Sequence, residues 1–297
     1  MARRPKPVPQ MTNAQFDDLF VDEDACKGYL KARRWPNGVY CPRCGSTKVY
    51  ELKTRPFHWQ CQACTEHGYR FSVIAGTIFE NTNKPLRDWF KVVHLMLASK
   101  KGMSALQIMR LMGFGSYTTA WSMCHKIRAA LIEPEAKLGG IVEVDETFIG
   151  GKSHNKHGGR TGIKGGTKGK TPIIGAVSRE GNVIARVLKR VTRDAAERFV
   201  KEMVSDKVSL LATDQSSVYR HLEGYPHQAV DHRARKYVVG AVHTNTIEGF
   251  WSIFKRGVIG SFHKVSEKYL PLYVAEFQYR YNNRNNPDIF GNAIAGC

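Results

Sequence analysis

The chain has 297 residues, of which 42% are hydrophobic and 24% are charged. A chain of this length and composition can fold into two or three compact units. It has no apolar run near the roughly 18–20 residues of a membrane-spanning helix, and its start, MARRPKPVPQ, lacks the apolar core of a signal peptide. We therefore expect a globular protein that stays in the cytoplasm.

The charge balance indicates a polyanionic partner. Lys and Arg number 45 against 26 Asp and Glu, which gives a formal net charge of +19. Such an excess opposes compact folding unless an anion relieves it, and nucleic acid is the usual partner of a chain this basic. The alternative is a generally basic surface that has no specific ligand.

Four of the seven cysteines form two CxxC pairs, Cys41 with Cys44 and Cys61 with Cys64, separated by sixteen residues. Each pair can turn two thiolates toward one point, and two pairs complete a tetrahedral site that suits zinc. Four protein ligands leave the zinc no open position, so we expect a structural ion in a ribbon over residues 38–72. A redox dithiol is the alternative, and it would leave the second pair unexplained.

Helical patterns surround the ribbon. Residues 1–37 are expected to form a helical lead-in, and residues 84–133 a helical domain whose first helix lies within KPLRDWFKVVHLMLAS. A second helix is expected from the cap Ser104 to Gly113, and a third over roughly 116–132.

Two short helices joined by a tight turn after a longer helix suggest a DNA-binding helix-turn-helix. The last helix would then offer polar side chains to a groove of the duplex: Thr118, Thr119, Ser122, His125 and Lys126. Many three-helix packings that do not bind DNA share this spacing.

Beyond the turn-forming stretch EPEAKLGG the pattern changes to strands, and we place a second domain of the mixed α/β class at 138–290. IVEVDETFI alternates as a strand, and PIIGAVSREGNVIARVLK predicts two strands around a turn. A helix capped near Thr192, a strand ending at Asp214, the short strand HQAVDH and further helices follow. Residues 151–170 hold seven Gly and six Lys or Arg without an acid, so we expect a flexible basic loop there.

Three carboxylates fall where a metal site is expected in this order of elements. Asp145 lies in the first strand, Asp214 ends a later strand, and Glu248 follows on a helix. Oxygen ligands of this kind suit Mg²⁺ or Mn²⁺. Two such ions about 4 Å apart would activate a water or a 3′-hydroxyl and stabilise the leaving oxygen of a phosphodiester.

The residues themselves leave alternatives open. Glu143 shares a strand face with Asp145, and Glu146 is adjacent, so alternation leaves either of them as the ligand. Asp214, which precedes Gln-Ser-Ser, is equally placed to cap a helix.

The helix expected over HTNTIEGFWSIFKR carries Asn245, Glu248 and Lys255 on one face. Lys255 would form a surface ion pair or bind a phosphate beside the metals. Phe250 and Trp251 are expected to pack the helix on the sheet.

The whole chain also resembles bacterial insertion-sequence transposases of the DDE type, specifically the ISXO-type family with an N-terminal zinc ribbon. The resemblance runs from about residue 15 to 285 and rests on these stretches: YLKARRWPNGVYCPRCG, FSVIAGTIFENTNKPLRDWF, VEVDETFIGGK, TDQSSVY and HTNTIEGFWSIFKRGVIGSFHKVSEKYLPLYVAEFQYRYNNR.

The resemblance implies an RNase H-like core in which Asp145 and Asp214 are the first two metal ligands. Members of the family are described with Glu or Asn as the third, and this chain has both Glu248 and Asn245. We favour Glu248 because an anionic oxygen binds Mg²⁺ better than an amide, and because Lys255 lies at the seven-residue offset typical of DDE enzymes. Asn245 would then touch DNA or orient a ligand.

The resulting hypothesis is a DNA transposase with structural Zn²⁺ and two catalytic Mg²⁺ or Mn²⁺ ions. It would bind the inverted-repeat ends of its element, cut the strands there and join them to target DNA, as a homodimer or higher oligomer on double-stranded DNA. The alternatives are a DNA-binding regulator derived from a transposase, and an RNase H-fold nuclease or resolvase that cuts without joining.

Overall fold

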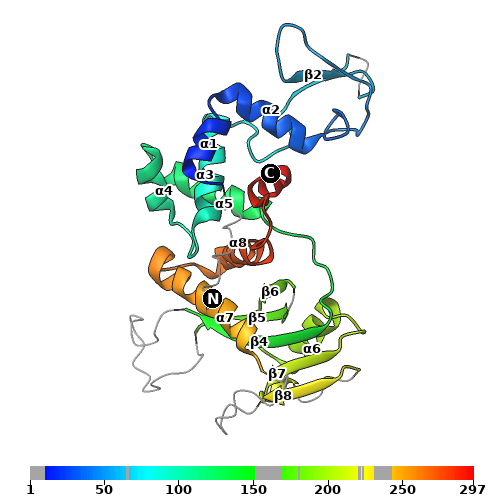
Figure 1. The fold of residues 1–297 in the computed structure, drawn as a ribbon, viewed down its shortest axis with the longest axis vertical. Coiled ribbons are helices and arrows are strands. Elements are labelled where there is room, and N and C mark those ends of the chain that lie inside the picture. Colours follow the sequence, from blue (N-terminus) through cyan, green and yellow to red (C-terminus); the bar gives the residue numbers. More distant parts are fainter. Residues whose placement is uncertain are drawn as a thin grey trace, which may run out of the picture. The chain divides into compact units, whose positions relative to one another are not determined.

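The computed structural model describes residues 11–64, 67–150, 169–179, 181–219, 222, 224–230 and 243–297 (Figure 1). The chain divides into two compact units. Unit 1 comprises Met1–Leu131 and Arg284–Cys297, and unit 2 comprises Ile132–Asn283. The range 138–290 expected for the second domain is therefore longer than unit 2 at its C-terminal end. The basic loop expected at 151–170 lies outside the described residues except for its last two.

Unit 1 is built on helices that pack around aromatic rings. Its helices are α1 (Asn13–Leu19), α2 (Glu23–Arg34), α3 (Leu86–Ala98), α4 (Ala105–Met112), α5 (Tyr117–Ala130) and α9 (Ile289–Gly296). Phe20 of α1's C-terminal cap contacts Phe90 of α3 and Phe290 of α9, with ring centroids 5.1 and 5.6 Å away. The C-terminal helix is thus part of the core of unit 1.

The ribbon expected over residues 38–72 has three short antiparallel strands, β1 (Val49–Glu51), β2 (His58–Cys61) and β3 (Tyr69–Ser72), in the order β1-β2-β3. Its apolar core is small. The ring of Trp59 lies 5.4 Å from that of Trp35 and 5.9 Å from that of Phe71. So few buried side chains support a fold of this size poorly, which agrees with the need for a bound metal.

The predicted second helix of the helical domain is confirmed at both ends. The Ser104 hydroxyl accepts the backbone N–H of Gln107 at 3.2 Å, and Gly113 ends α4 in the left-handed conformation, with φ of 64°. This turn leads into α5 after Ser116. A tight turn therefore joins α4 to α5 after α3, as the sequence predicts, but α5 is not short: it has 14 residues and α3 has 13.

One of the residues expected to face a groove does not do so. His125 is 8% exposed, and its ring stacks on Trp121 at a centroid distance of 4.0 Å. The Nδ1 atom lies 2.9 Å from the carbonyl oxygen of Trp121. The expectation for His125 is wrong because this position of α5 faces the helical core, whereas Thr118 and Lys126 are exposed.

Unit 2 is a five-stranded mixed sheet with helices on both faces. Its elements are β4 (Ile141–Ile149), β5 (Thr171–Ser178), β6 (Val183–Val187), α6 (Arg193–Met203), β7 (Leu210–Asp214), β8 (His227–Val230), α7 (Asn245–Gly257) and α8 (Leu270–Asn282). The strand order is β6-β5-β4-β7-β8; β4, β5 and β6 pair antiparallel, whereas β7 pairs parallel with β4 and with β8. The core is RNase H-like, as expected.

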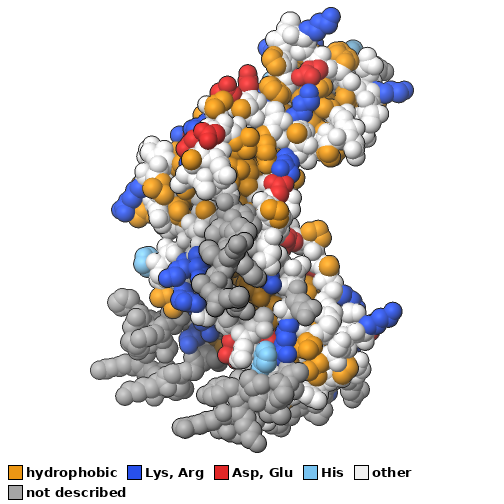
Figure 2. All heavy atoms as spheres, in the orientation of Figure 1, with side chains coloured by type: hydrophobic (Ala, Val, Ile, Leu, Met, Phe, Trp, Pro, Cys, Tyr) orange, Lys and Arg blue, Asp and Glu red, His pale blue; other side chains and the backbone are white. Residues whose placement is uncertain are grey.

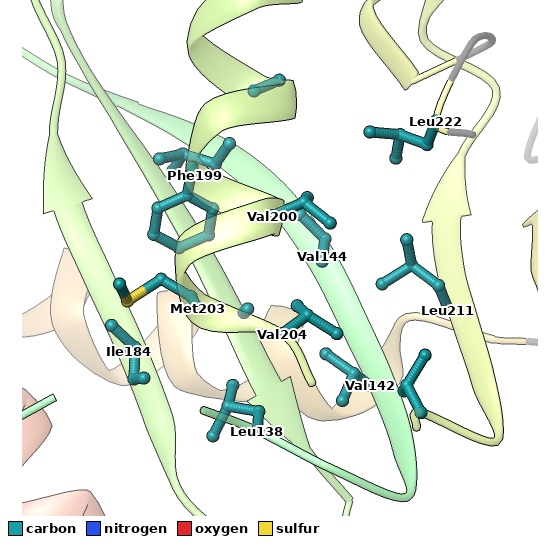
Figure 3. Close-up of a cluster of buried hydrophobic side chains, with 14 of the residues drawn as sticks. Leu138, Val142, Val144, Ile184, Phe199, Val200, Met203, Val204, Leu211 and Leu222 are labelled. Carbon is teal, nitrogen blue, oxygen red and sulfur yellow. The ribbon is translucent and has the colours of Figure 1, made fainter. Parts of the chain in front are cut away.

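Alternate side chains of β4 face different helices. Val142 and Val144 pack against α6, and Figure 3 shows Phe199, Val200 and Met203 of that helix directed at this face of the sheet. The opposite face packs against α7 and α8. The odd-numbered residues of β4, which include Asp145, therefore lie on the α7 side.

Helix α7 lies close to the sheet because β5 has a glycine beneath it. Gly175 pairs with Asp145 across the strands, and a Cβ built on it would lie 2.6 Å from Cζ2 of Trp251. Phe250 and Trp251 are 2% and 3% exposed, so the expectation that they pack the helix on the sheet is confirmed.

Candidate active site and zinc centre

Asp145 in the middle of β4 and Asp214 at the end of β7 lie on neighbouring parallel strands. The register pairs Val144 of β4 with Thr213 of β7, so the two aspartates occupy the next position on neighbouring strands. Adjacent strands lie about 4.8 Å apart, and both carboxylates lie on the α7 side. Asp214 Oδ1 accepts the backbone N–H of Ser216 at 3.0 Å, which holds this carboxylate at the strand end.

Helix α7 brings Glu248 toward these aspartates. The side chain of Glu248 is exposed. Its Oε1 accepts a hydrogen bond of 2.8 Å from the hydroxyl of Thr244, which occupies the cap position of the helix. The negative charge of Glu248 contributes to raising the pKa of Asp145. The two carboxylates are therefore near enough to repel each other.

The two other acidic residues of β4 are engaged by the chain itself. Glu143 is fully buried and accepts the backbone N–H groups of Thr246 and Ile247 in the first turn of α7, at 2.8 and 3.0 Å. Glu146 points to the opposite face, where its Oε2 accepts the hydroxyl of Tyr219 at 2.5 Å. Burial raises the pKa of Tyr219 well above its ordinary value, so this hydroxyl keeps its proton.

Among the described residues, Asp145 has no such side-chain partner. Within the described part of the chain, no Lys, Arg or His forms an ion pair with it. Burial, the largest cause, raises the pKa of its carboxyl to about 7, and the charges of Glu146 and Asp214 add to the rise. A carboxylate that is desolvated and repelled in this way favours a bound cation, which is the property expected of a divalent metal ligand.

Asn245 and Lys255 lie on α7 as the sequence predicts. Both are exposed, at the first residue and near the last turn of the helix. Figure 2 shows Lys and Arg side chains over the C-terminal part of this helix, where Lys255 and Arg256 are exposed. Among the described residues Lys255 has no ion-pair partner, which is compatible with a role in holding phosphate.

The side of Asp214 opens on a hollow. A cavity of about 340 Å³ is lined at the ends of β7 and β8 by Asp214, Gln215, Ser216, Tyr219, His227 and Ala229. His227 Nε2 lies 2.8 Å from the hydroxyl oxygen of Thr213, and this contact holds the ring in place. A substrate therefore has room beside the second aspartate.

The ribbon's thiols form a closer group. All four sulfur atoms, of Cys41, Cys44, Cys61 and Cys64, lie within 4.8 Å of one another. The Sγ atoms of Cys41 and Cys64 are 3.7 Å apart, as are those of Cys44 and Cys61. Zinc–sulfur bonds of about 2.3 Å in a tetrahedron require sulfur separations of about 3.8 Å, so the thiols fit a zinc ion as they stand.

Among the described residues, these thiols are the one group of three or more His, Cys, Asp or Glu side chains that lie close enough to share a metal ion without moving. Asp145, Asp214 and Glu248 are neighbours, but their ligand atoms do not converge on one point. The zinc centre is therefore formed in advance, and the carboxylate site is not.

Sequence reasoning missed three features of the carboxylate site. They are the engagement of Glu143 by α7, the pairing of Glu146 with Tyr219 and the close approach that Gly175 permits. The glycine inside a predicted strand was the one available signal, because a strand glycine often marks a close approach.

Two family models of transposase domains match parts of the chain. Residues 137–282 match the family model of the ISXO2-like transposase domain, and residues 21–67 match that of the transposase zinc-ribbon domain. The chain is 28% identical, over 285 residues, to an uncharacterized protein in the transposable element ISH50 of Halobacterium salinarum. That alignment covers 88% of this chain and 91% of the relative.

A solved structure, the simian T-cell lymphotropic virus intasome in complex with PP2A regulatory subunit B56 gamma, is 16% identical with a TM-score of 0.30. The match covers 64% of this chain and spans 65% of that one. A likeness this low carries no argument. Separately, no helix among the described residues is long and apolar enough to cross a membrane.

Proposed function

Because residues 137–282 match the ISXO2-like transposase domain, we propose that the chain cuts DNA at the ends of a mobile element and joins the freed 3′-hydroxyls to target DNA. One observation carries the proposal. Asp145 and Asp214 occupy neighbouring positions on the parallel strands β4 and β7 with Glu248 nearby, and among the described residues Asp145 has no cationic partner. The other carboxylates of β4, Glu143 and Glu146, are engaged by bonds within the protein.

Asp145, Asp214 and Glu248 would hold two Mg²⁺ or Mn²⁺ ions, because carboxylate oxygens are the ligands these ions prefer. When bound, the ions supply the Lewis acidity that activates a water or a 3′-hydroxyl and neutralises charge on the phosphodiester. The exposed Lys255 would hold a phosphate oxygen, and Asn245 would orient the DNA strand or a ligand side chain.

Glu248 is favoured over Asn245 as the third ligand. The Thr244 hydroxyl already holds its carboxylate. An anionic oxygen also offsets more of the charge of two divalent cations than an amide oxygen does.

Recognition of the ends would fall to unit 1. The zinc ribbon carries exposed basic side chains, among them Arg43, Lys48, Lys53, Arg55 and Arg70. Exposed Thr118 and Lys126 of α5 would approach a groove in the manner of a helix-turn-helix. Two ends must be held together for joining, so we expect a dimer or higher oligomer on the DNA.

The experiment uses purified protein and duplexes that carry the terminal repeats found in the DNA on either side of the gene. With Mg²⁺ we expect strand cleavage at the repeat end and transfer of the 3′ end into a plasmid. Asp214→Asn should bind the duplex and do neither. Cleavage without transfer would identify a nuclease or resolvase, and binding without cleavage by the unchanged protein would identify a regulator; either result would replace our proposal.

A further inference from the structure

We infer that Glu143 is a positioning residue that fixes Glu248 relative to Asp145. The inference rests on the proposed function of Asp145, Asp214 and Glu248 as metal ligands. Glu143 itself binds no metal in this assignment, because its carboxylate oxygens are both occupied inside the protein. Oε2 accepts the N–H groups of Thr246 and Ile247, and Oε1 accepts the Thr246 hydroxyl at 2.9 Å.

Glu143 does the work of a helix cap for α7. The residue at the cap position, Thr244, makes no capping hydrogen bond with its side chain, and its hydroxyl is donated to Glu248 instead. The first N–H groups of a helix need an acceptor, and a carboxylate also interacts favourably with the positive end of the helix dipole. Because Glu143 supplies that acceptor, the Thr244 hydroxyl is left to hold the third ligand.

The hydrogen bonds of Glu143 connect Asp145 and Glu248, the proposed first and third ligands, through few residues. Glu143 and Asp145 lie two residues apart on one face of β4, which is about 6.8 Å along a strand. Glu143 binds Thr246 and Ile247, and the next residue is Glu248. The distance from Asp145 to Glu248 is therefore set by one strand and one helical turn.

Arg179 and His243 complete the anchor. Arg179 Nε donates to Glu143 Oε1 at 2.7 Å, and its Nη2 donates to the carbonyl oxygen of His243 at 2.9 Å. His243 Nδ1 lies 3.2 Å from the same carboxylate. Arg179 thus neutralises the buried charge and also binds the backbone just before α7. Loss of the carboxylate would leave the guanidinium and the helix N–H groups without their acceptor.

Glu143→Gln tests the inference with little change of volume. Its amide nitrogen must face either the helix N–H groups or Arg179, so one donor meets another. In Mg²⁺-free full-length protein we expect faster amide hydrogen exchange at residues 246–248 than in the unchanged chain. We also expect Mn²⁺ affinity, measured by electron paramagnetic resonance, to fall about tenfold, a loss of about 1.4 kcal/mol.

Glu276→Gln is the matched control. Glu276 is also fully buried and pairs with an arginine of its own helix, Arg280, at 3.4 Å. If burial of a charge is all that matters, both variants should lower the melting temperature and change Mn²⁺ affinity alike. Our inference requires that Glu276→Gln leave Mn²⁺ affinity and exchange at 246–248 unchanged.

Asp145→Asn separates this inference from the proposed function. Mn²⁺ binding that is equally strong in the unchanged protein and in Asp145→Asn would refute the metal site itself. Binding that depends on Asp145 but not on Glu143, with normal exchange in the first turn of α7, would overturn only the positioning role. Should Glu143→Gln not fold, Thr246→Val removes one bond to Glu143 at similar volume, and it must shift both measurements in the same direction.

Discussion

The four thiols of the ribbon and the three carboxylates of unit 2 differ in how far the protein arranges them in advance. The sulfur atoms already stand at the separations that zinc requires. The carboxylates lie near one another without converging, and Asp145 is desolvated and repelled. A structural metal completes a fold that is otherwise too small, whereas our proposal assigns the repelled carboxylates to binding the catalytic metals. Changes to the first site should affect folding, and changes to the second should affect chemistry.

The largest effect that would sharpen this contrast is expected from Asp145→Asn. The change removes a metal-binding charge but little volume, so strand cleavage should fall by about 10³-fold or more while DNA affinity stays within a few fold. Glu146→Gln is the matched control, because Glu146 faces Tyr219 on the other side of the sheet and should retain activity within about tenfold. Gel assays measure the cleavage and the DNA binding of each variant. Equal cleavage by Asp145→Asn and the unchanged protein would contradict the assignment of Asp145 as a metal ligand.

The next largest effect is expected from Glu248→Gln, which should lower cleavage at least about 10²-fold and raise the Mg²⁺ concentration needed for activity. Asn245→Ala should cost less, since it removes no charge from the site. Cleavage rates measured against Mg²⁺ concentration for both variants distinguish the two residues. An inactive Asn245→Ala protein beside an active Glu248→Gln protein would assign the third ligand to Asn245.

Loss of zinc should act on folding rather than on chemistry. Cys61→Ser, or a strong chelator, should unfold the ribbon and weaken binding to the repeat ends, because the thiols and not the few buried rings hold this region. Metal analysis should find one zinc per chain in the unchanged protein and in His58→Ala, whose ring is turned to the backbone of Pro56. A Cys61→Ser protein that retains zinc and a folded ribbon would contradict the claim that the thiol site is needed for folding.

A smaller effect is expected under α7. Gly175→Ala forces Trp251 and the helix away from the sheet, so it should destabilise unit 2 by about 1–3 kcal/mol and lower cleavage. Gly249→Ala has nothing within 4 Å of the new methyl group and should instead stabilise α7, by about 0.5–1 kcal/mol. Urea unfolding measures both. A stabilising Gly175→Ala would show that the helix is free to move.

The smallest effect concerns the stability of unit 2 without Mg²⁺. Because the pKa of Asp145 rises to about 7 in the folded protein, its ionisation destabilises the fold increasingly as pH rises from about 4 to 7. Asp145→Asn should therefore melt a few degrees higher at pH 8, and no higher at pH 4. Calorimetry in buffer without divalent ions tests this; an equal or lower melting temperature at pH 8 would contradict it.

Local signals explain what the sequence predicted well. The cysteine spacing predicted that the four thiols lie together, and the caps of α4 and α6 depend on Ser104, Gly113 and Thr192, each of which acts within one helical turn. The strand that ends at Asp214 and the short strand after it are confirmed for the same reason, because an apolar run and its turn residues lie together in the chain.

The roles of the acidic residues on β4 could not be predicted in this way. Alternation shows that Glu143 and Asp145 share a face but not which of them meets the end of a helix a hundred residues later. The same holds for His125, whose burial depends on the packing of neighbouring helices. Such assignments follow from tertiary contacts, which a single sequence does not reveal.

The place of α9 bears on the order in which the protein can fold. It contacts α2 and α3, Asp288 pairs with Arg33, and the backbone N–H of Ile78 donates to the carbonyl oxygen of Cys297 at 2.9 Å. During synthesis, residues 284–297 follow all of unit 2. Unit 1 can therefore complete its core only after the whole of unit 2 has been synthesised. Products that stop short of residue 284 would leave the aromatic core of unit 1 open, because Phe290 contacts Phe16, Phe20 and Phe90.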